Sequence, residues 1–90
     1  MPRVKFTSHL QRYFPTLQET TVEGHTVAEV VAVLDERYPG LADYVLDDQG
    51  ALRKHVNIFI DEDVITDRTT LQDPVSELNR VYIFQALSGG

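Results

Sequence analysis

The residues with the clearest chemical potential are the two glycines at the end of the chain, Gly89 and Gly90. Neither has a Cβ atom, so together they present a carboxylate on a backbone thin enough for a channel that is closed to other residue types. Such a tail permits activation of the terminal carboxyl itself. The C-terminus is then a substrate that other enzymes modify, and the folded part is the surface that they bind. The alternative is a terminal dipeptide without function, such as a frayed end or a cloning remnant.

The segment before the glycines favours the functional interpretation. Residues 80–86 form a run of β-branched and aromatic side chains, which is typical of a strand. We therefore expect a last strand over residues 81–86, from which only Leu87, Ser88, Gly89 and Gly90 project. This divides the chain into a folded domain, residues 1–86, and a flexible Gly-Gly tail, residues 87–90.

The composition is that of a single soluble domain. In 90 residues, 42% are hydrophobic and 24% are charged, which excludes an intrinsically disordered chain. The chain has no cysteine, so disulfides, thiolate metal sites and a cysteine nucleophile are excluded. The first residues are too short and too polar for a signal peptide, and no apolar run is long enough to span a bilayer. We expect a cytoplasmic protein that does not bind membranes.

The net charge of −6, from fourteen acidic and eight basic residues, argues against a nucleic-acid partner. It fits docking on a basic partner surface, and it equally fits an acidic surface that is simply solvated. The histidines are widely spaced, and residues 61–63 lack the alternating ligands of a calcium loop, so no metal site is expected. No phosphate-binding loop or dinucleotide fingerprint occurs, so we expect no stably bound cofactor.

The first part of the chain predicts a hairpin. Residues 3–7 alternate as a strand, with Val4 and Phe6 on one face, and residues 17–23 form a second extended segment. Residues 8–15 are expected to form a loop between them.

The clearest helix signal begins at Thr26, where Thr26 and Glu29 form a capping box. Four apolar residues then fall at helical spacing and form one stripe: Val27, Val30, Val31 and Leu34. Pro39 and Gly40 end the helix near Arg37 or Tyr38. Residues 41–46 predict a further short helical turn.

The second half predicts three strands: residues 55–60, a short strand at Val64 and Ile65 after an acidic turn, and residues 81–86. The resulting order is β-β-α-β-β-β, with one main helix to cover one face of the sheet. The predicted class is α+β, with a mixed sheet of four to five strands.

Alternation along these strands also predicts an open sheet face. If the aliphatic residues of each strand face the helix, Phe59, Tyr82 and Phe84 lie on the opposite face. An aromatic cluster there is either a docking surface or a set of cross-strand pairs that stabilise the sheet.

The terminal strand with Leu87, Ser88, Gly89 and Gly90, together with residues 52–64, resembles the ubiquitin-like β-grasp sulfur carriers of the MoaD/ThiS type. The resemblance covers the whole chain. It is strongest to the branch that supplies sulfur for cysteine biosynthesis or acts as a stand-alone carrier. Two departures bear on the subfamily: residues 77–80 replace a common Asp-Gly-Asp turn, and Gln85 and Ala86 stand where many members have a proline.

The resemblance implies a carrier rather than an enzyme. An E1-like adenylating enzyme would use ATP and Mg²⁺ to convert the Gly90 carboxylate to an acyl-adenylate, and sulfur would then replace AMP to leave a thiocarboxylate. Gly89 and Gly90 would be the reactive tail. Leu87 and Ser88 would thread the entrance of the partner's active site, and the three aromatics would be the docking patch.

The resemblance leaves the sulfur acceptor open among the molybdopterin synthase large subunit, a cysteine-synthase-like enzyme and thiazole synthase. Two other functions also stay open: a ubiquitin-like modifier joined through Gly90 to lysines of other proteins, and a non-catalytic β-grasp interaction domain with an inert tail.

Overall fold

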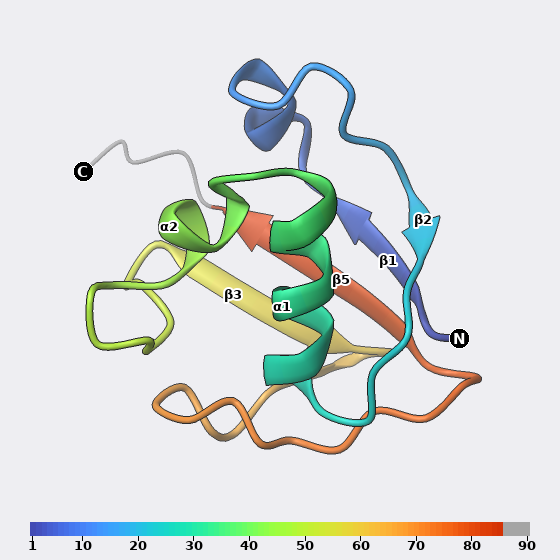
Figure 1. Cartoon of the computed structure of the whole chain (residues 1–90). Coiled ribbons are helices and arrows are strands. Elements are labelled where there is room, and N and C mark those ends of the chain that lie inside the picture. The colour runs from blue at the N-terminus through green and yellow to red at the C-terminus, as the bar shows by residue number, and fades with distance from the viewer. Residues whose placement is uncertain (86–90) are drawn as a thin grey trace.

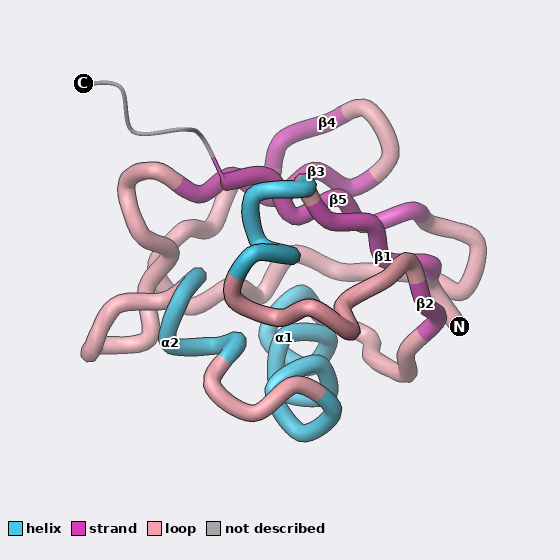
Figure 2. The backbone as a smooth tube through the Cα atoms, turned by 90° about the horizontal axis from the view of Figure 1, so that it is seen from above, coloured by secondary structure: helices cyan, strands magenta, loops and turns pink. Residues whose placement is uncertain are grey.

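The computed structural model describes residues 1–85, which form one sheet with the helices on one side of it (Figures 1 and 2). The elements in chain order are β1 (Arg3–Phe6), the 3₁₀ helix η1 (Ser8–Arg12), β2 (Thr20–Thr21), α1 (Val27–Arg37), α2 (Leu41–Val45), β3 (Val56–Ile60), β4 (Asp63–Val64) and β5 (Arg80–Gln85). The predicted α+β class with a mixed sheet and one main helix is confirmed.

The last strand lies at the centre of the sheet. The strand order is β2-β1-β5-β3-β4, with β5 parallel to β1 and antiparallel to β3. The register places Val4 beside Val81 and Ile58 beside Ile83, so the aliphatic side chains of three strands form one continuous surface. Helix α1 crosses this surface, as Figure 1 shows.

The core lies between α1 and the sheet. The side chains predicted for the helix stripe, Val27, Val30, Val31 and Leu34, are at most 2% exposed. The strand residues predicted to face the helix are also buried, except Phe6 and Ile60, which pack at the margin: Val4, Val56, Ile58, Val81 and Ile83. Each such side chain contributes about 1.5–3 kcal/mol of hydrophobic stabilisation.

The predicted capping box at the start of α1 is present. The Thr26 hydroxyl accepts a hydrogen bond from the backbone N–H of Glu29 at 3.2 Å, and the Glu29 carboxylate accepts from the backbone N–H of His25 at 2.9 Å. Two further N–H groups of the first turn, those of Val27 and Ala28, donate to the carbonyls of Asp73 and Leu71. The segment before β5 thus supplies the acceptors that the helix start requires.

Residues 66–73, which precede β5, have an irregular backbone that two carboxylates hold in place. The Asp67 carboxylate accepts from the N–H groups of Thr69, Thr70 and Gln72 and from the Thr70 hydroxyl, and these bonds hold the pKa of Asp67 well below its ordinary value. The Asp73 carboxylate accepts from the backbone and hydroxyl of Thr66 and from the backbone of Asp67, which lowers the pKa of Asp73.

The segment between β1 and β2 differs from the prediction. Residues 8–12 form η1 rather than a loop, because Leu10 is fully buried and holds the turn against the core. The extended segment predicted over residues 17–23 is a strand only at β2. Leu17 and Val22 on either side are buried, so the core holds them without strand pairing.

The fourth strand is shifted by one residue from the predicted Val64 and Ile65. It begins at Asp63, which pairs with Ile60, while Ile65 leaves the strand and is 5% exposed. Asp61 in the turn has a φ of +56°, a left-handed conformation that tightens the connection between β3 and β4. The predicted acidic turn is therefore two residues long.

Candidate functional site

The central strand β5 determines where the C-terminal segment leaves the domain. Its last residue, Gln85, pairs with Val56 at the start of β3, and the Gln85 N–H donates to the Thr7 hydroxyl at 3.4 Å. Ala86, which was predicted to end the strand, lies outside the described residues, and so do the predicted tail residues Leu87, Ser88, Gly89 and Gly90. The structure thus defines the position of Gln85, and the roles of the tail residues stay predictions.

The three aromatics predicted for the open face come together on the side of the sheet away from the helices. Phe59 on β3 pairs with Tyr82 on β5, and the Tyr82 and Phe84 rings stack with centroids 6.2 Å apart. Phe84 is 39% exposed, whereas Phe59 and Tyr82 are half-buried. Phe59 and Tyr82 are cross-strand neighbours and Phe84 is exposed, so both cross-strand pairing and surface exposure are present.

One member of this patch was missed by the sequence reasoning. Val64 on β4 pairs with Phe59 and is 47% exposed, so it extends the aromatic cluster toward the sheet edge. We call Phe59, Val64, Tyr82 and Phe84 the apolar patch. With a turn of two residues, Asp61 and Glu62, the alternation of side chains along the strands would have placed Val64 on the same face as Phe59.

Basic side chains lie beside the apolar patch. Lys5 on β1 pairs with Tyr82, and Arg3 pairs with Arg80. Glu19 forms ion pairs with Arg3 at 2.7 Å and with Lys5 at 3.9 Å, and the hydrogen bond from Arg3 is the main cause of its lowered pKa. The two cations at the β1 side of the patch therefore share one carboxylate.

A second basic group lies at the tail end of the patch. Arg68 donates to the Asn57 side-chain oxygen at 2.8 Å and to the Arg53 carbonyl at 2.7 Å. Asn57 pairs with Phe84, so these bonds fix the Arg68 guanidinium beside the end of β5. Sequence reasoning could not find this contact because Arg68 belongs to the irregular segment, which has no periodicity.

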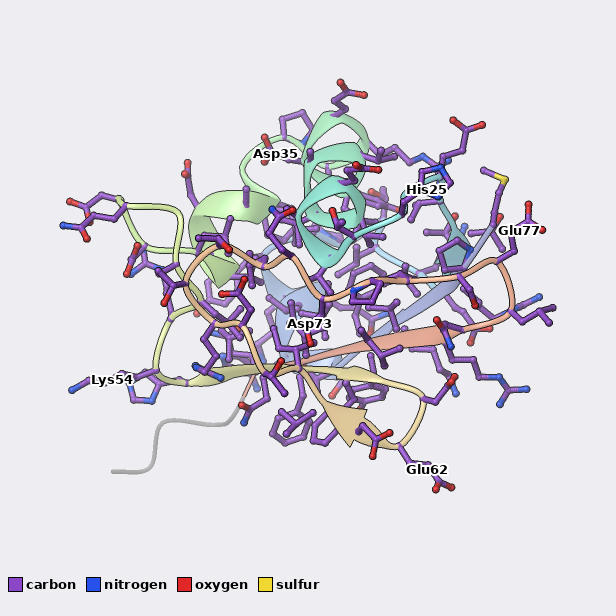
Figure 3. All side chains as sticks on the ribbon, turned by 90° about the horizontal axis from the view of Figure 1, so that it is seen from below. His25, Asp35, Lys54, Glu62, Asp73 and Glu77 are labelled. Carbon is purple, nitrogen blue, oxygen red and sulfur yellow. The ribbon has the colours of Figure 1, made fainter. Side chains whose placement is uncertain are left out.

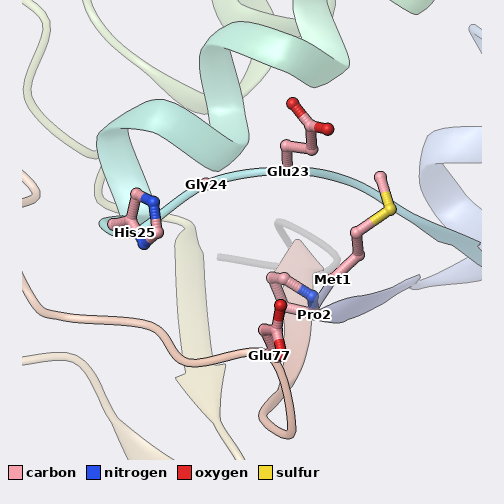
Figure 4. Close-up of a pocket in the computed structure, with 6 residues that line it drawn as sticks. All are labelled: Met1, Pro2, Glu23, Gly24, His25 and Glu77. Carbon is pink, nitrogen blue, oxygen red and sulfur yellow. The ribbon is translucent and has the colours of Figure 1, made fainter.

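A separate pocket of about 260 Å³ lies at the other end of β5 (Figure 4). It is lined by Met1, Pro2, Glu23, Gly24, His25 and Glu77. Because β1 starts next to the start of β5, this pocket is a full strand length from Gln85. Within residues 1–85, no three His, Asp or Glu side chains gather closely enough to hold a metal ion.

The sequence profile of the ThiS family matches residues 11–90. The chain belongs to the ThiS family of ubiquitin-like sulfur carriers. The profile match includes Gly89 and Gly90, and the predicted family resemblance is confirmed. No helix within residues 1–85 has the length and apolar character that crossing a membrane requires.

Solved structures show the same β-grasp fold. A structure of the Amycolatopsis orientalis BexX/CysO complex matches with a TM-score of 0.85 and 17% identity over the whole of both chains. Mycobacterium tuberculosis CysO matches with a TM-score of 0.83 and 20% identity over 97% of this chain and all of that one. The small archaeal modifier protein 1 of Methanosarcina acetivorans matches with a TM-score of 0.77 and 24% identity over 98% and 94%. No curated protein sequence gives a significant match.

Proposed function

We propose that this ThiS-family chain carries sulfur as a thiocarboxylate on Gly90. The observation that supports this most directly is the family match, which extends through Gly89 and Gly90 and thus covers the reactive end of a carrier. The domain itself supplies no acid, base or metal ligand to the reaction. It is a co-substrate that an adenylating enzyme and then a sulfur-accepting synthase bind in turn.

The chemistry proceeds in two displacements. A carboxylate oxygen of Gly90 attacks the α-phosphorus of ATP, pyrophosphate leaves, and an acyl-adenylate forms on the E1-like enzyme with its Mg²⁺. Sulfide then attacks the acyl carbon, a C–S bond replaces the C–O bond to AMP, and AMP leaves. If the donor is a persulfide, a thiol must reduce the resulting acyl disulfide. Since this chemistry consumes ATP, the proposal places the chain in the cytoplasm.

The apolar patch fits the docking role in this scheme. It is on the sheet face that the helices leave uncovered, and Phe84 lies one residue before the last described position of β5. A partner that covers the patch is thus adjacent to the point where residues 86–90 begin. Leu87 and Ser88 would pass through the entrance of its active site, and Gly89 and Gly90 would reach the reacting groups.

Intact-mass measurement tests the proposal. The untagged protein is incubated with ATP, Mg²⁺, the adenylating enzyme and sulfide, and we expect a mass gain equal to the exchange of one oxygen for sulfur. The matched control is the chain without Gly90, which retains every described core residue and should melt at the same temperature as the wild type. The proposal fails if the wild-type mass does not change while the enzyme modifies another carrier, or if the shortened chain gains sulfur equally.

A second function uses the same activated carboxyl. Several fold neighbours are named small archaeal modifier proteins, so conjugation of Gly90 to lysines of other proteins is the alternative. A lysine amine would attack the acyl carbon and AMP would leave, which yields an isopeptide. Tryptic peptides whose lysine carries residues 81–90 of this chain, the remnant left by cleavage after Arg80, would favour this alternative. A non-catalytic interaction domain predicts neither the remnant nor the mass gain.

We propose only the class of the sulfur acceptor: it is a synthase for molybdopterin, for cysteine or for the thiamin thiazole. The two CysO matches share the fold at 17% and 20% identity. Assays of the thiocarboxylated chain with each synthase in turn would identify the acceptor by its product.

A further inference from the structure

Three basic residues lie near the end of the sheet at which Gln85 pairs with Val56. Arg53 and Lys54 are exposed just before β3, and Arg68 is fixed beside them through the Arg53 carbonyl and Asn57. We call Arg53, Lys54 and Arg68 the basic cluster. Figure 3 shows Lys54 at the opposite end of the sheet from Glu62 and Glu77.

The cluster differs from Arg3 and Lys5 of β1 in its partners. Among residues 1–85 the ion pairs are those of Arg3 and Lys5, and both use Glu19. The cluster binds neutral acceptors instead. Arg68 uses an amide oxygen and a carbonyl, and the Arg53 Nε donates to the Asp43 carbonyl at 3.1 Å. Arg53 and Arg68 are therefore held in place, and none of the three cations forms an ion pair within residues 1–85.

One carboxylate close to the cluster, that of Asp47, is hydrogen-bonded to the backbone of its own loop. Asp47 lines a shallow hollow of about 330 Å³ with Leu52, Arg53, Lys54 and His55. Its carboxylate accepts from the backbone N–H groups of Gln49 and Ala51, at 2.9 and 3.0 Å. At physiological ionic strength, charges beyond about 8 Å are strongly screened, so we expect the three cations to outweigh the Asp47 carboxylate and to make this surface locally positive on a protein of net charge −6.

We propose that the basic cluster docks against carboxylate side chains at the rim of the partner site that the C-terminal tail enters. This rests on the proposed function, since it describes the surface of the partner that takes up Gly90. Charge complementarity of this kind orients a complex and raises its rate of formation. Asn57, which accepts a hydrogen bond from Arg68, pairs with Phe84, so the Arg68 end of the cluster adjoins the apolar patch.

The position of the cluster favours a contact with the rim of the partner's site over a contact with the nucleotide bound inside that site. Five residues separate Gln85 from the end of Gly90, and a fully extended chain of that length spans about 17 Å. The adenylated carboxyl would therefore react deep in the partner while the cluster stays at the entrance. An extended polyanion such as RNA is disfavoured, because the eight basic residues, of which the cluster holds three, face fourteen acidic ones.

Pyrophosphate exchange tests the proposal, with the purified adenylating enzyme that activates the wild-type chain as the probe. We expect Lys54→Gln to raise the KM for the carrier about threefold, and Arg53→Gln with Lys54→Gln about tenfold, with kcat unchanged. Raising the salt from about 50 to about 300 mM should raise the wild-type KM and have a smaller effect on the double variant.

The matched control is Leu78→Glu, which changes the net charge by the same amount as Lys54→Gln. Leu78 is 93% exposed and precedes β5 at the end far from the tail. We expect its KM to equal that of the wild type. An equal rise in both variants would show that only total charge matters, and a rise in the KM for ATP instead would assign the cluster to the nucleotide. Either result overturns the proposal.

A second measurement separates this proposal from the proposed function. Soluble nitroxides carrying a carboxylate or an amine report the local potential through the relaxation of nearby amide protons, without any partner. We expect the carboxylate nitroxide to act more strongly at Lys54, His55 and Asn57, and the amine nitroxide more strongly along α1. Equal effects of the two probes at Lys54 would refute the positive region even if sulfur transfer occurs.

Discussion

The replacement Phe84→Ala separates docking from folding at the apolar patch. Phe84 is 39% exposed, and its described ring contact is with Tyr82 on the same strand. Truncation of a fully buried phenylalanine costs about 3–5 kcal/mol, and Phe84 is buried over roughly three fifths of its surface without a core cavity to leave behind. We therefore expect a loss of about 1–2 kcal/mol in the free energy of unfolding, measured in urea.

The expected effect on partner binding is larger. An aromatic side chain at the centre of an interface contributes about 2 kcal/mol or more on truncation, which is roughly a thirtyfold increase in Kd. The assay is the KM of the carrier in pyrophosphate exchange, at a temperature where the variant is folded.

The control is the neighbouring Ile83→Ala, on the opposite face. Ile83 is fully buried, so we expect it to lose about 2–5 kcal/mol of stability with little change in KM. The reasoning is refuted if Phe84→Ala loses as much stability as Ile83→Ala while its KM stays at the wild-type value, because Phe84 would then serve the fold alone.

Two further predictions concern the domain itself. Gly24→Ala should destabilise it by about 1–3 kcal/mol in urea, because the new Cβ would lie 2.9 Å from Val30 Cγ2, whereas Gly50→Ala has open space and should cost only about 1 kcal/mol for its φ of +83°. The hydrogen bonds that lower the pKa values of Asp67 and Asp73 stabilise the folded state when both carboxylates are ionised. This contribution is fully present at a pH above the ordinary pKa of 3.8, and it is lost as the pH falls through the lowered pKa values. As the pH is lowered beneath about 4, the melting temperature should therefore decrease, and it should decrease less steeply in Asp67→Asn. An equally steep fall in that variant would contradict the assignment.

Periodic segments of this chain were predictable from the sequence. The capping box at Thr26 and the apolar stripe that ends at Leu34 depend on contacts within one helix, so local rules specify them. The alternation along β3 and β5 likewise specified which side chains face α1 and which form the open face.

The remaining features depend on contacts between distant segments. Leu17 and Val22 have a strand-like sequence, yet the core buries both while only Thr20 and Thr21 pair with β1. Arg68 reaches Asn57 from a segment without periodicity, so no spacing rule relates the two. These contacts exist because the sheet brings the segments together, and a sequence pattern does not record that proximity.

The distribution of charge over the surface likewise cannot be derived from the sequence alone. The total of −6 fits both a basic partner surface and a solvated acidic surface, and totals carry no information on distribution. The composition counts every cation alike. It does not distinguish Arg3, which pairs with Glu19, from Arg68, which binds neutral acceptors. Only the structure distinguishes them.

The central position of β5 also has a consequence for biosynthesis. Its pairing with β1 joins Arg80 to Arg3, so the sheet closes only after nearly the whole domain has been synthesised. Without β5 the strands would separate into the pairs β2-β1 and β3-β4, which are marginal on their own. Such long-range closure is slow, on the order of milliseconds to seconds. A chain truncated before β5 should thus neither fold nor carry the residues that follow this strand, and a partner that recognises the folded sheet would reject incomplete products.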